Sequence, residues 1–132
     1  AEPPVDLAAL GDALRKDSLQ ELCVADRNLF RKNRIGPGGA AALAEALRNN
    51  TSLQELRLSD QGIGCKGAVA LGKALRENAS LRVLRLVRNG IGSEGGLALA
   101  EVLRSNTSLR ELYLSSNRLG NVGAVGLAEA LR

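Results

Sequence analysis

The stretch SLRVLRLVRNGIGSEGGLALAEVLRSN at residues 80–106 decides the fold, because similar stretches recur along the chain at one fixed spacing. Equivalent leucines stand at Leu53, Leu81 and Leu109, and the constant interval between them is the repeat period. Each leucine opens the pattern L-x-x-L-x-L, which is followed by an amide residue, Gln61, Asn89 or Asn117. One such unit cannot bury its apolar face alone, so the units are expected to stack on one another.

The spacing of the apolar residues changes within each unit. In SLQELRLSDQGIG, at 52–64, Leu56 and Leu58 alternate with polar residues, as in a strand with one buried face. From 67 to 76 the apolar residues recur at helical spacing. We therefore expect a strand and then a helix in each unit. Four glycines would start the helices and let them approach the strand layer: Gly39, Gly67, Gly95 and Gly123.

The amides after the strands are expected to be structural. An Asn side chain in the turn after a strand can bond backbone groups of the neighbouring turns, which stacking would otherwise bury without partners. Asn89 and Asn117 fit this role, and Gln61 replaces them in the second unit. We call each level of the stack a rung. Because the longer amide of Gln61 makes looser bonds, we expect its rung to be slightly less stable.

The units GAVALGKALRENASLRVLRLVRNGIG at 67–92 and GLALAEVLRSNTSLRELYLSSNRLG at 96–120 resemble leucine-rich repeats of the ribonuclease-inhibitor subfamily. Repeats of this kind occur in NOD-like innate immune receptors and in the Ran GTPase-activating protein, and the resemblance covers almost the whole chain. It implies an α/β solenoid, a horseshoe segment with a parallel β-sheet on the concave side and α-helices on the convex side. It also implies that the concave sheet and adjacent loops bind a partner, although the fold does not select one function.

Length and composition indicate a single domain, residues 1–132, of about four repeats. The segment VDLAALGDAL at 5–14 predicts an N-terminal capping helix within 1–18. Two cysteines are too few for a disulfide framework, and neither a secretory leader nor a membrane-spanning run is recognisable, which favours a cytoplasmic location. The net charge of +4 comes from basic residues interleaved with acidic ones, so neither nucleic acid nor membrane is expected as a partner.

The residue types argue against an enzyme. The chain has no His, so it lacks the commonest general base, and its two cysteines, Cys23 and Cys65, are far apart in sequence. The glycines of GPGG at 36–39 precede a helix, but the Lys-Ser/Thr of a phosphate-binding loop does not follow them. We expect no cofactor, no metal site and no catalytic residues.

The first unit is irregular. The interval from Leu19 to Leu53 is longer than the repeat period, so this unit contains extra residues. If Leu19, Leu22 and Val24 form the first strand, the surplus falls in a basic loop at 27–34 that contains Phe30, Arg31 and Lys32. This loop would either contact a partner or cover the first rung with Phe30. An alternative register places Phe30 at the third strand position and Asn33 in the amide column.

Strand geometry predicts the partner-binding positions, because side chains between the buried leucines point to the concave face. Arg57 and Arg85 would be neighbours about 4.8 Å apart, with Tyr113 beside them, and Arg and Tyr dominate the energetics of many interfaces. A second interpretation is a solvated sheet on which glutamates neutralise the arginines. The candidate site comprises Glu55, Arg57, Val83, Arg85, Val87, Glu111 and Tyr113, with Phe30, Arg31 and Lys32 of the loop.

We expect an intracellular protein–protein interaction module, for instance the recognition part of an innate immune receptor or of a scaffold. The alternatives are a GTPase-activating segment of the Ran type and a structural repeat chain with no partner. The sequence stops at Arg132, inside the fourth helix by repeat alignment. The open end predicts self-association through the C-terminal repeat or continuation into further repeats.

Overall fold

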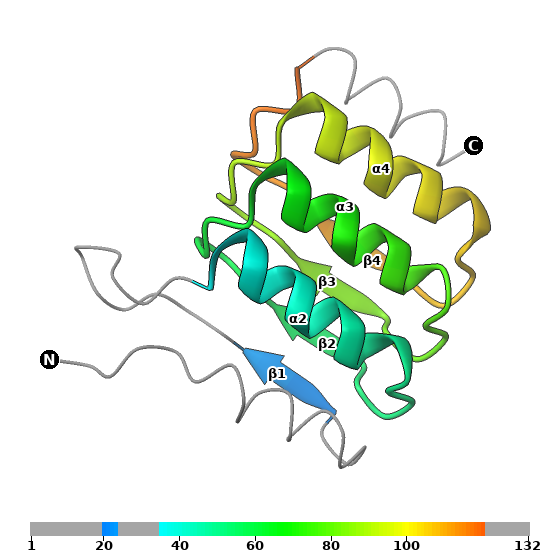
Figure 1. Cartoon of the computed structure of the whole chain (residues 1–132). Helices are drawn as coiled ribbons and strands as arrows, with labels where there is room; N and C mark the ends of the chain where they lie inside the picture. The colour runs from blue at the N-terminus through cyan, green and yellow to red at the C-terminus, as the bar shows by residue number, and fades with distance from the viewer. Residues whose placement is uncertain (1–19, 24–34, 121–132) are drawn as a thin grey trace, which may run out of the picture.

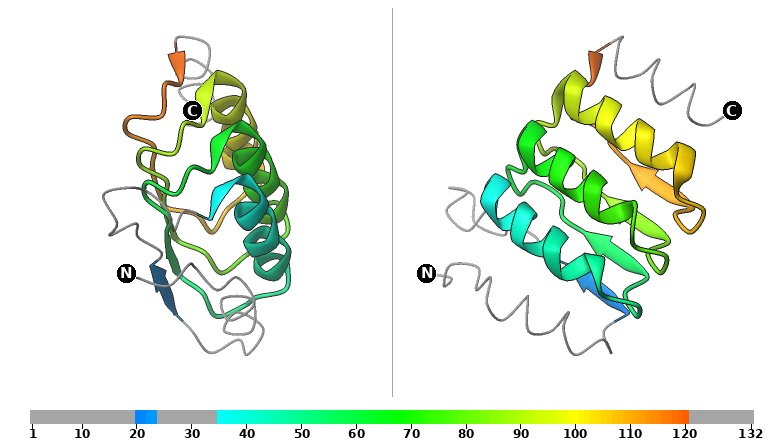
Figure 2. Two further views of the ribbon diagram at one scale, coloured as in Figure 1. Left: turned by 60° about the vertical axis from the view of Figure 1, so that its left-hand side comes forward. Right: turned by 45° about the vertical axis from the view of Figure 1, so that its right-hand side comes forward.

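The computed structural model describes residues 20–23 and 35–120, which form a curved stack of strands and helices (Figure 1). In the side view of Figure 2 the helices form one layer and the sheet forms the other. The strands are β1 (Glu21–Cys23), β2 (Glu55–Arg57), β3 (Val83–Arg85) and β4 (Glu111–Tyr113). The helices are α2 (Gly36–Arg48), α3 (Gly64–Leu75) and α4 (Gly92–Ser105). The expected α/β solenoid is confirmed.

All four strands are parallel and lie in chain order, β1-β2-β3-β4. Leu22 pairs with Leu56, Leu56 with Leu84, and Leu84 with Leu112, so one leucine row runs across the sheet. This confirms the register that begins with Leu22 and rules out the alternative through Phe30. The 27–34 loop itself lies outside the described residues, as do the capping segment 1–18 and Gly123.

The core lies between the two layers. The strand-side leucines and the isoleucines before α3 and α4 are almost fully buried, and leucines of the helices meet them. Removing this apolar surface from water is the main stabilising contribution to the stack. The largest fully buried side chains are Leu47, Leu53, Leu56, Leu58, Ile63, Leu71, Leu75, Leu81, Leu84, Leu86 and Ile91.

The helices begin earlier than predicted, at glycines with left-handed backbone such as Gly64 (φ 69°). Gly67 lies inside α3. A Cβ on Gly67 would collide with Cγ2 of Ile63 and lie 3.1 Å from Cβ of Ala40 in α2. Gly95 has the same relation to Ile91 and α3. These glycines therefore leave room both for the isoleucine that precedes the helix and for the neighbouring helix.

The predicted amide column is present. Asn89 Nδ2 donates to the Leu58 carbonyl at 2.7 Å, and Asn89 Oδ1 accepts from the Gln61 N–H at 2.8 Å. Asn117 repeats both contacts one rung later. Gln61 Oε1 accepts from the Ile35 N–H at 3.3 Å. Gln61 Nε2 also donates to the Ser59 carbonyl at 3.3 Å, as Asn89 Nδ2 does to the Val87 carbonyl. The lower stability expected at Gln61 stays a prediction.

A second amide column, which the sequence analysis missed, lies at the other end of the strands. Asn78 Nδ2 donates to the Leu47 and Asn50 carbonyls at 2.9 and 3.1 Å, and its Oδ1 accepts from the Leu81 N–H at 2.8 Å. Asn106 does the same one repeat later. The recurrence of Asn50, Asn78 and Asn106 at the repeat period was the available signal.

Candidate functional site

The candidate site is the concave face of the sheet. The register places Glu55 beside Val83 and Val83 beside Glu111, and it places Arg57, Arg85 and Tyr113 in a second row. Because Leu56 and Leu84 point into the core, their neighbours along each strand point away from it. The predicted strand residues are therefore brought together on one surface.

Five of these side chains form a continuous chain of contacts, which we call the concave column: Glu55, Arg57, Arg85, Glu111 and Tyr113. Glu55 accepts a hydrogen bond from Arg57 (Nη2 to Oε2, 3.1 Å) and pairs with Arg85 (Nε to Oε1, 3.6 Å). The Arg85 guanidinium carbon lies 4.2 Å from the centre of the Tyr113 ring. The Tyr113 hydroxyl donates to Glu111 Oε1 at 3.0 Å.

Glu55 is better shielded than its two arginine partners, with 15% of its side chain exposed against 48% for Arg57 and 36% for Arg85. Its hydrogen bond and negative charge raise the pKa of the Arg57 guanidinium above the ordinary value, so Arg57 stays protonated. Arg85 Nε is buried, and 3.6 Å from Glu55 is ion-pair distance but too long for a hydrogen bond. This N–H therefore has no hydrogen-bond acceptor within the described part of the chain.

The geometry combines the two interpretations of the sequence. Glu55 neutralises arginines, as the solvated-sheet interpretation expected, and the Arg85 that it pairs with also lies against the Tyr113 ring, as the predicted row of Arg57, Arg85 and Tyr113 would allow. Val83 and Val87 are half-buried beside the column. Phe30, Arg31 and Lys32 lie outside the described residues, so their place at the site stays a prediction.

The sequence analysis missed four arginines that surround the column. Arg82 and Arg110 directly precede β3 and β4, while Arg88 and Arg118 lie in the turns that follow these strands, and all four are exposed. No acidic group in 20–23 or 35–120 forms an ion pair with them. Aligning the sequence at its repeat period would have shown that they collect on two adjacent strands.

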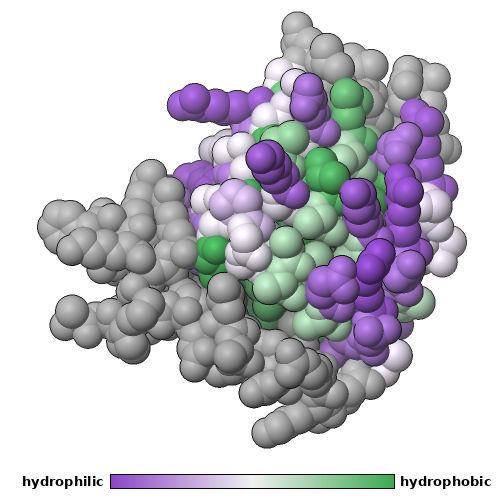
Figure 3. Space-filling model, in the orientation of Figure 1, coloured by the Kyte–Doolittle hydropathy of each residue, from purple (hydrophilic) through white to green (hydrophobic). Residues whose placement is uncertain are grey.

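The convex face is different, because its charges pair across helices. Arg48 lies 3.2 Å from Glu45 in its own helix and 3.3 Å from Glu77 of the following turn, and Arg76 bonds Glu101 of α4 at 3.0 Å. Figure 3 shows hydrophilic side chains alternating with pale hydrophobic areas over this face. Exposed pairs of this kind stabilise by about 0–1 kcal/mol each and suggest no ligand.

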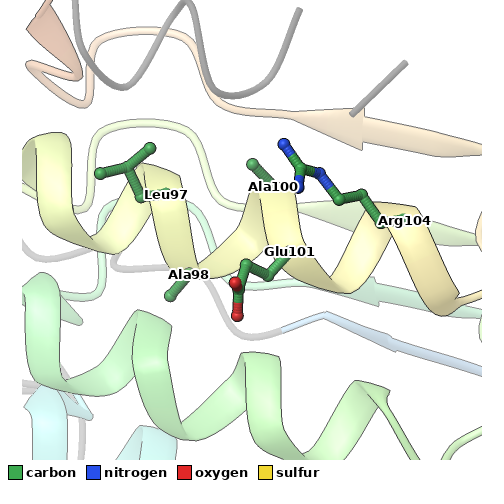
Figure 4. A pocket seen from close by; sticks show the side chains of 5 residues that line it. All are labelled: Leu97, Ala98, Ala100, Glu101 and Arg104. Atoms are coloured by element: carbon green, nitrogen blue, oxygen red, sulfur yellow. The ribbon is translucent and has the colours of Figure 1, made fainter. Parts of the chain in front are cut away.

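A hollow of about 390 Å³ lies along the outer side of α4. Leu97, Ala100 and Arg104 line one side of it, and Ala98 and Glu101 line the side toward α3 (Figure 4). Glu101 already pairs with Arg76 at 3.0 Å, and we assign no ligand to this hollow.

Two further kinds of site were sought among the residues that the structure places. No three His, Cys, Asp or Glu side chains of 20–23 and 35–120 gather as metal ligands would. Over the same ranges, no helix is both long and apolar enough to span a membrane.

Comparisons with known proteins agree with this architecture. A structure of leiomodin-1 actin-binding site 2 superposes with a TM-score of 0.84 at 22% identity, over 98% of this chain and 74% of that one. The tropomodulin C-terminal domain from Caenorhabditis elegans superposes with a TM-score of 0.56 at 18% identity, over 96% and 92% of the two chains. At identities this low, the superpositions show a shared fold and no more. No curated protein matches the chain in sequence.

The sequence profile described as Leucine Rich repeat matches the chain three times, at residues 49–72, 77–100 and 105–128. The first two matches each span one strand and most of the helix that follows it, the third spans β4, and all three recur at the period that the leucines define. Together the three matches cover more than half of the 132 residues. The chain belongs to the leucine-rich repeat family.

Proposed function

We propose that the chain is a protein-binding module that holds its partner on the concave sheet. The observation that carries this proposal is the pre-arranged Arg85–Tyr113 pair, with the guanidinium 4.2 Å from the ring centre and Glu55 on its other side. Neighbouring side chains already fix both anchors, so binding would cost less side-chain entropy than binding through free arginines. Arg and Tyr are also the residue types most often found at the energetic centre of an interface.

The composition of the concave face adds a second argument. Arg85 and Tyr113 form a polar and aromatic centre between the half-buried Val83 and Val87. Polar groups beside apolar side chains are the usual mixture of a protein interface.

Actin is the first partner to test, because a solved structure of the same fold is a leiomodin-1 actin-binding site. Its identity of 22% makes actin a choice of probe rather than an inherited property. Recognition within an innate immune receptor or a scaffold, and GTPase activation of the Ran type, rest on the resemblance of the repeats to the ribonuclease-inhibitor subfamily. We further infer a cytoplasmic, non-enzymatic protein, from the cysteine content and the absence of His in the sequence.

The test compares two variants that each remove two positive charges. Arg57→Gln with Arg85→Gln alters the concave column, and Arg48→Gln with Arg76→Gln alters the convex face. Glutamine is used because a new glutamate beside Glu55 would add charge repulsion. In calorimetric titrations with monomeric actin, we expect the concave variant to bind more weakly by about 2 kcal/mol, roughly 30-fold, and the convex control to bind normally.

Two results would contradict parts of the proposal. If the unaltered chain does not bind actin, actin is excluded, and the same pair of variants is tested with a partner identified by cross-linking in cell extract. If the concave and convex variants bind the partner equally well, the concave sheet is not the site. Circular dichroism melts of both variants check that each is folded.

A further inference from the structure

The concave side of the stack is electrically divided. The segments 82–90 and 110–118, which contain β3 and β4, carry five arginines against a single acidic residue, Glu111. The equivalent segment 54–62 around β2 carries one arginine against Glu55 and Asp60. The excess of four positive charges on two rungs equals the net charge of the whole chain. Stacking of the repeats therefore brings together arginines that are interleaved with acidic residues in the linear sequence.

Two of these arginines are neighbours without compensation. Arg82 and Arg110 precede paired residues of β3 and β4, and the Arg110 N–H donates to the Arg82 carbonyl at 2.8 Å. Like charges on adjacent strands destabilise a sheet. The corresponding residues of the two earlier rungs are Gln20 and Gln54, so a neutral side chain fits this place in the repeat.

Two more arginines lie at the other end of the strands. Arg88 and Arg118 are exposed in the turns after β3 and β4. Arg118 has φ 53°, a left-handed backbone that favours glycine, and the two equivalent residues of the earlier turns are Gly62 and Gly90, both with φ 64°. The chain thus holds an arginine where its own repeat uses glycine. Unfavourable backbone of this kind is often found at binding sites.

We infer that Arg82, Arg85, Arg88, Arg110 and Arg118, together the basic lane, bind an acidic segment of the partner protein. This inference rests on the proposed function and names the chemistry of its ligand. The basic lane runs along the strand direction for about six residues, or roughly 20 Å. An extended peptide of about six residues has the same length. Carboxylates along such a peptide would complement the exposed guanidinium groups of Arg82, Arg88, Arg110 and Arg118.

The surroundings favour a peptide over nucleic acid. Glu111 lies inside the lane and would repel a phosphate backbone. Tyr113 is the aromatic residue of the four strands, and its ring is already covered by Arg85, so it is not free to stack on a base. A peptide, in contrast, can place a neutral residue opposite Glu111 and acidic residues on either side.

The experiment measures binding of a fluorescent ten-residue peptide of alternating Glu and Ser by anisotropy, at low and at physiological salt. The matching Lys-Ser peptide and single-stranded DNA and RNA of ten nucleotides are measured in parallel. We expect the intact chain to bind the acidic peptide best and Arg82→Gln with Arg110→Gln to weaken that binding about tenfold. The same variant should melt at a higher temperature, because the repulsion between the two arginines is removed.

The convex variant, Arg48→Gln with Arg76→Gln, is the charge-matched control and should bind the peptide normally while melting no higher than the unaltered chain. The inference is overturned if the acidic peptide does not bind, if its affinity is the same in the lane variant, or if DNA or RNA binds more tightly than the peptide. These outcomes leave the proposed function intact. That function fails separately, when Arg57→Gln with Arg85→Gln leaves the affinity for the natural partner unchanged.

Discussion

The buried amide column and the concave column cross the same rungs of one solenoid, but they differ in how their residues vary. At the amide position the chain uses Gln61, Asn89 and Asn117, all amides and all at most 2% exposed. At the equivalent concave position it uses Arg57, Arg85 and Tyr113, which differ in charge and are half-buried or exposed. Both columns recur at the same period. Only the amide column repeats its chemistry.

The difference follows from what each column contacts. The amides bond backbone groups, which are the same in every rung, so one side chain solves the same problem each time. The concave side chains face solvent and one another, and the stack does not dictate their identity. Columns whose residue type is constant therefore stabilise the fold, whereas columns whose residue type varies can determine which partner binds.

The largest expected effect comes from breaking the uniform column at Asn89. In Asn89→Ala, the Leu58 carbonyl and the Gln61 N–H lose bonds of 2.7 and 2.8 Å inside the stack. Leaving two buried polar groups without partners should reduce the free energy of unfolding by about 3 kcal/mol, measured by urea denaturation. The exposed Asn49→Ala is the control, with an expected change within about 0.5 kcal/mol. A loss below about 1 kcal/mol for Asn89→Ala would mean that the column is not essential to the stack.

A second uniform column, the glycines inside the helices, should give an intermediate effect. In Gly67→Ala the new methyl group would meet the buried Ile63 side chain and Ala40 of α2. Forcing these groups apart should lower stability by about 2 kcal/mol in the same urea assay. Gly38→Ala is the matched change, because a methyl group there has no atom within 4 Å, and it should be neutral or stabilising by about 0.5 kcal/mol. Equal effects of the two changes would show that helix approach does not need Gly67.

The sequence predicted what the repeat period controls. The leucine row, the strand register and the Arg57–Arg85–Tyr113 row all follow from that constant interval, and the structure places them as expected. The contacts of Gly67 with Ile63 and Ala40 could not be predicted this way, because they depend on how closely α2 and α3 pack. The basic lane was missed for another reason. Its arginines look interleaved with acids in the linear sequence and become neighbours only after the rungs are stacked.

The smallest expected effect comes from Arg118, where the two kinds of column meet. Its turn position is uniform in the earlier rungs, at Gly62 and Gly90, but arginine occupies it in this one, with φ 53°. A left-handed backbone costs a residue other than glycine about 1–2 kcal/mol in the folded state, and replacing Arg118 with glycine removes that cost. Glycine is also freer in the unfolded chain, which offsets about 0.5–1 kcal/mol of this stabilisation. Arg118→Gly should therefore raise the free energy of unfolding by about 0.5–1 kcal/mol and slightly weaken binding of the acidic peptide.

Arg110→Gly is the control for Arg118→Gly, because it removes the same charge at a residue without left-handed backbone. It should weaken binding of the acidic peptide at least as much. The protein should become no more stable, because the greater freedom of glycine in the unfolded chain offsets the relief of the repulsion between Arg82 and Arg110. If Arg118→Gly fails to stabilise the protein, the turn does not carry the backbone cost argued here. If it stabilises without changing peptide affinity, Arg118 lies outside the basic lane, and the lane contracts to the arginines at β3 and at the start of β4.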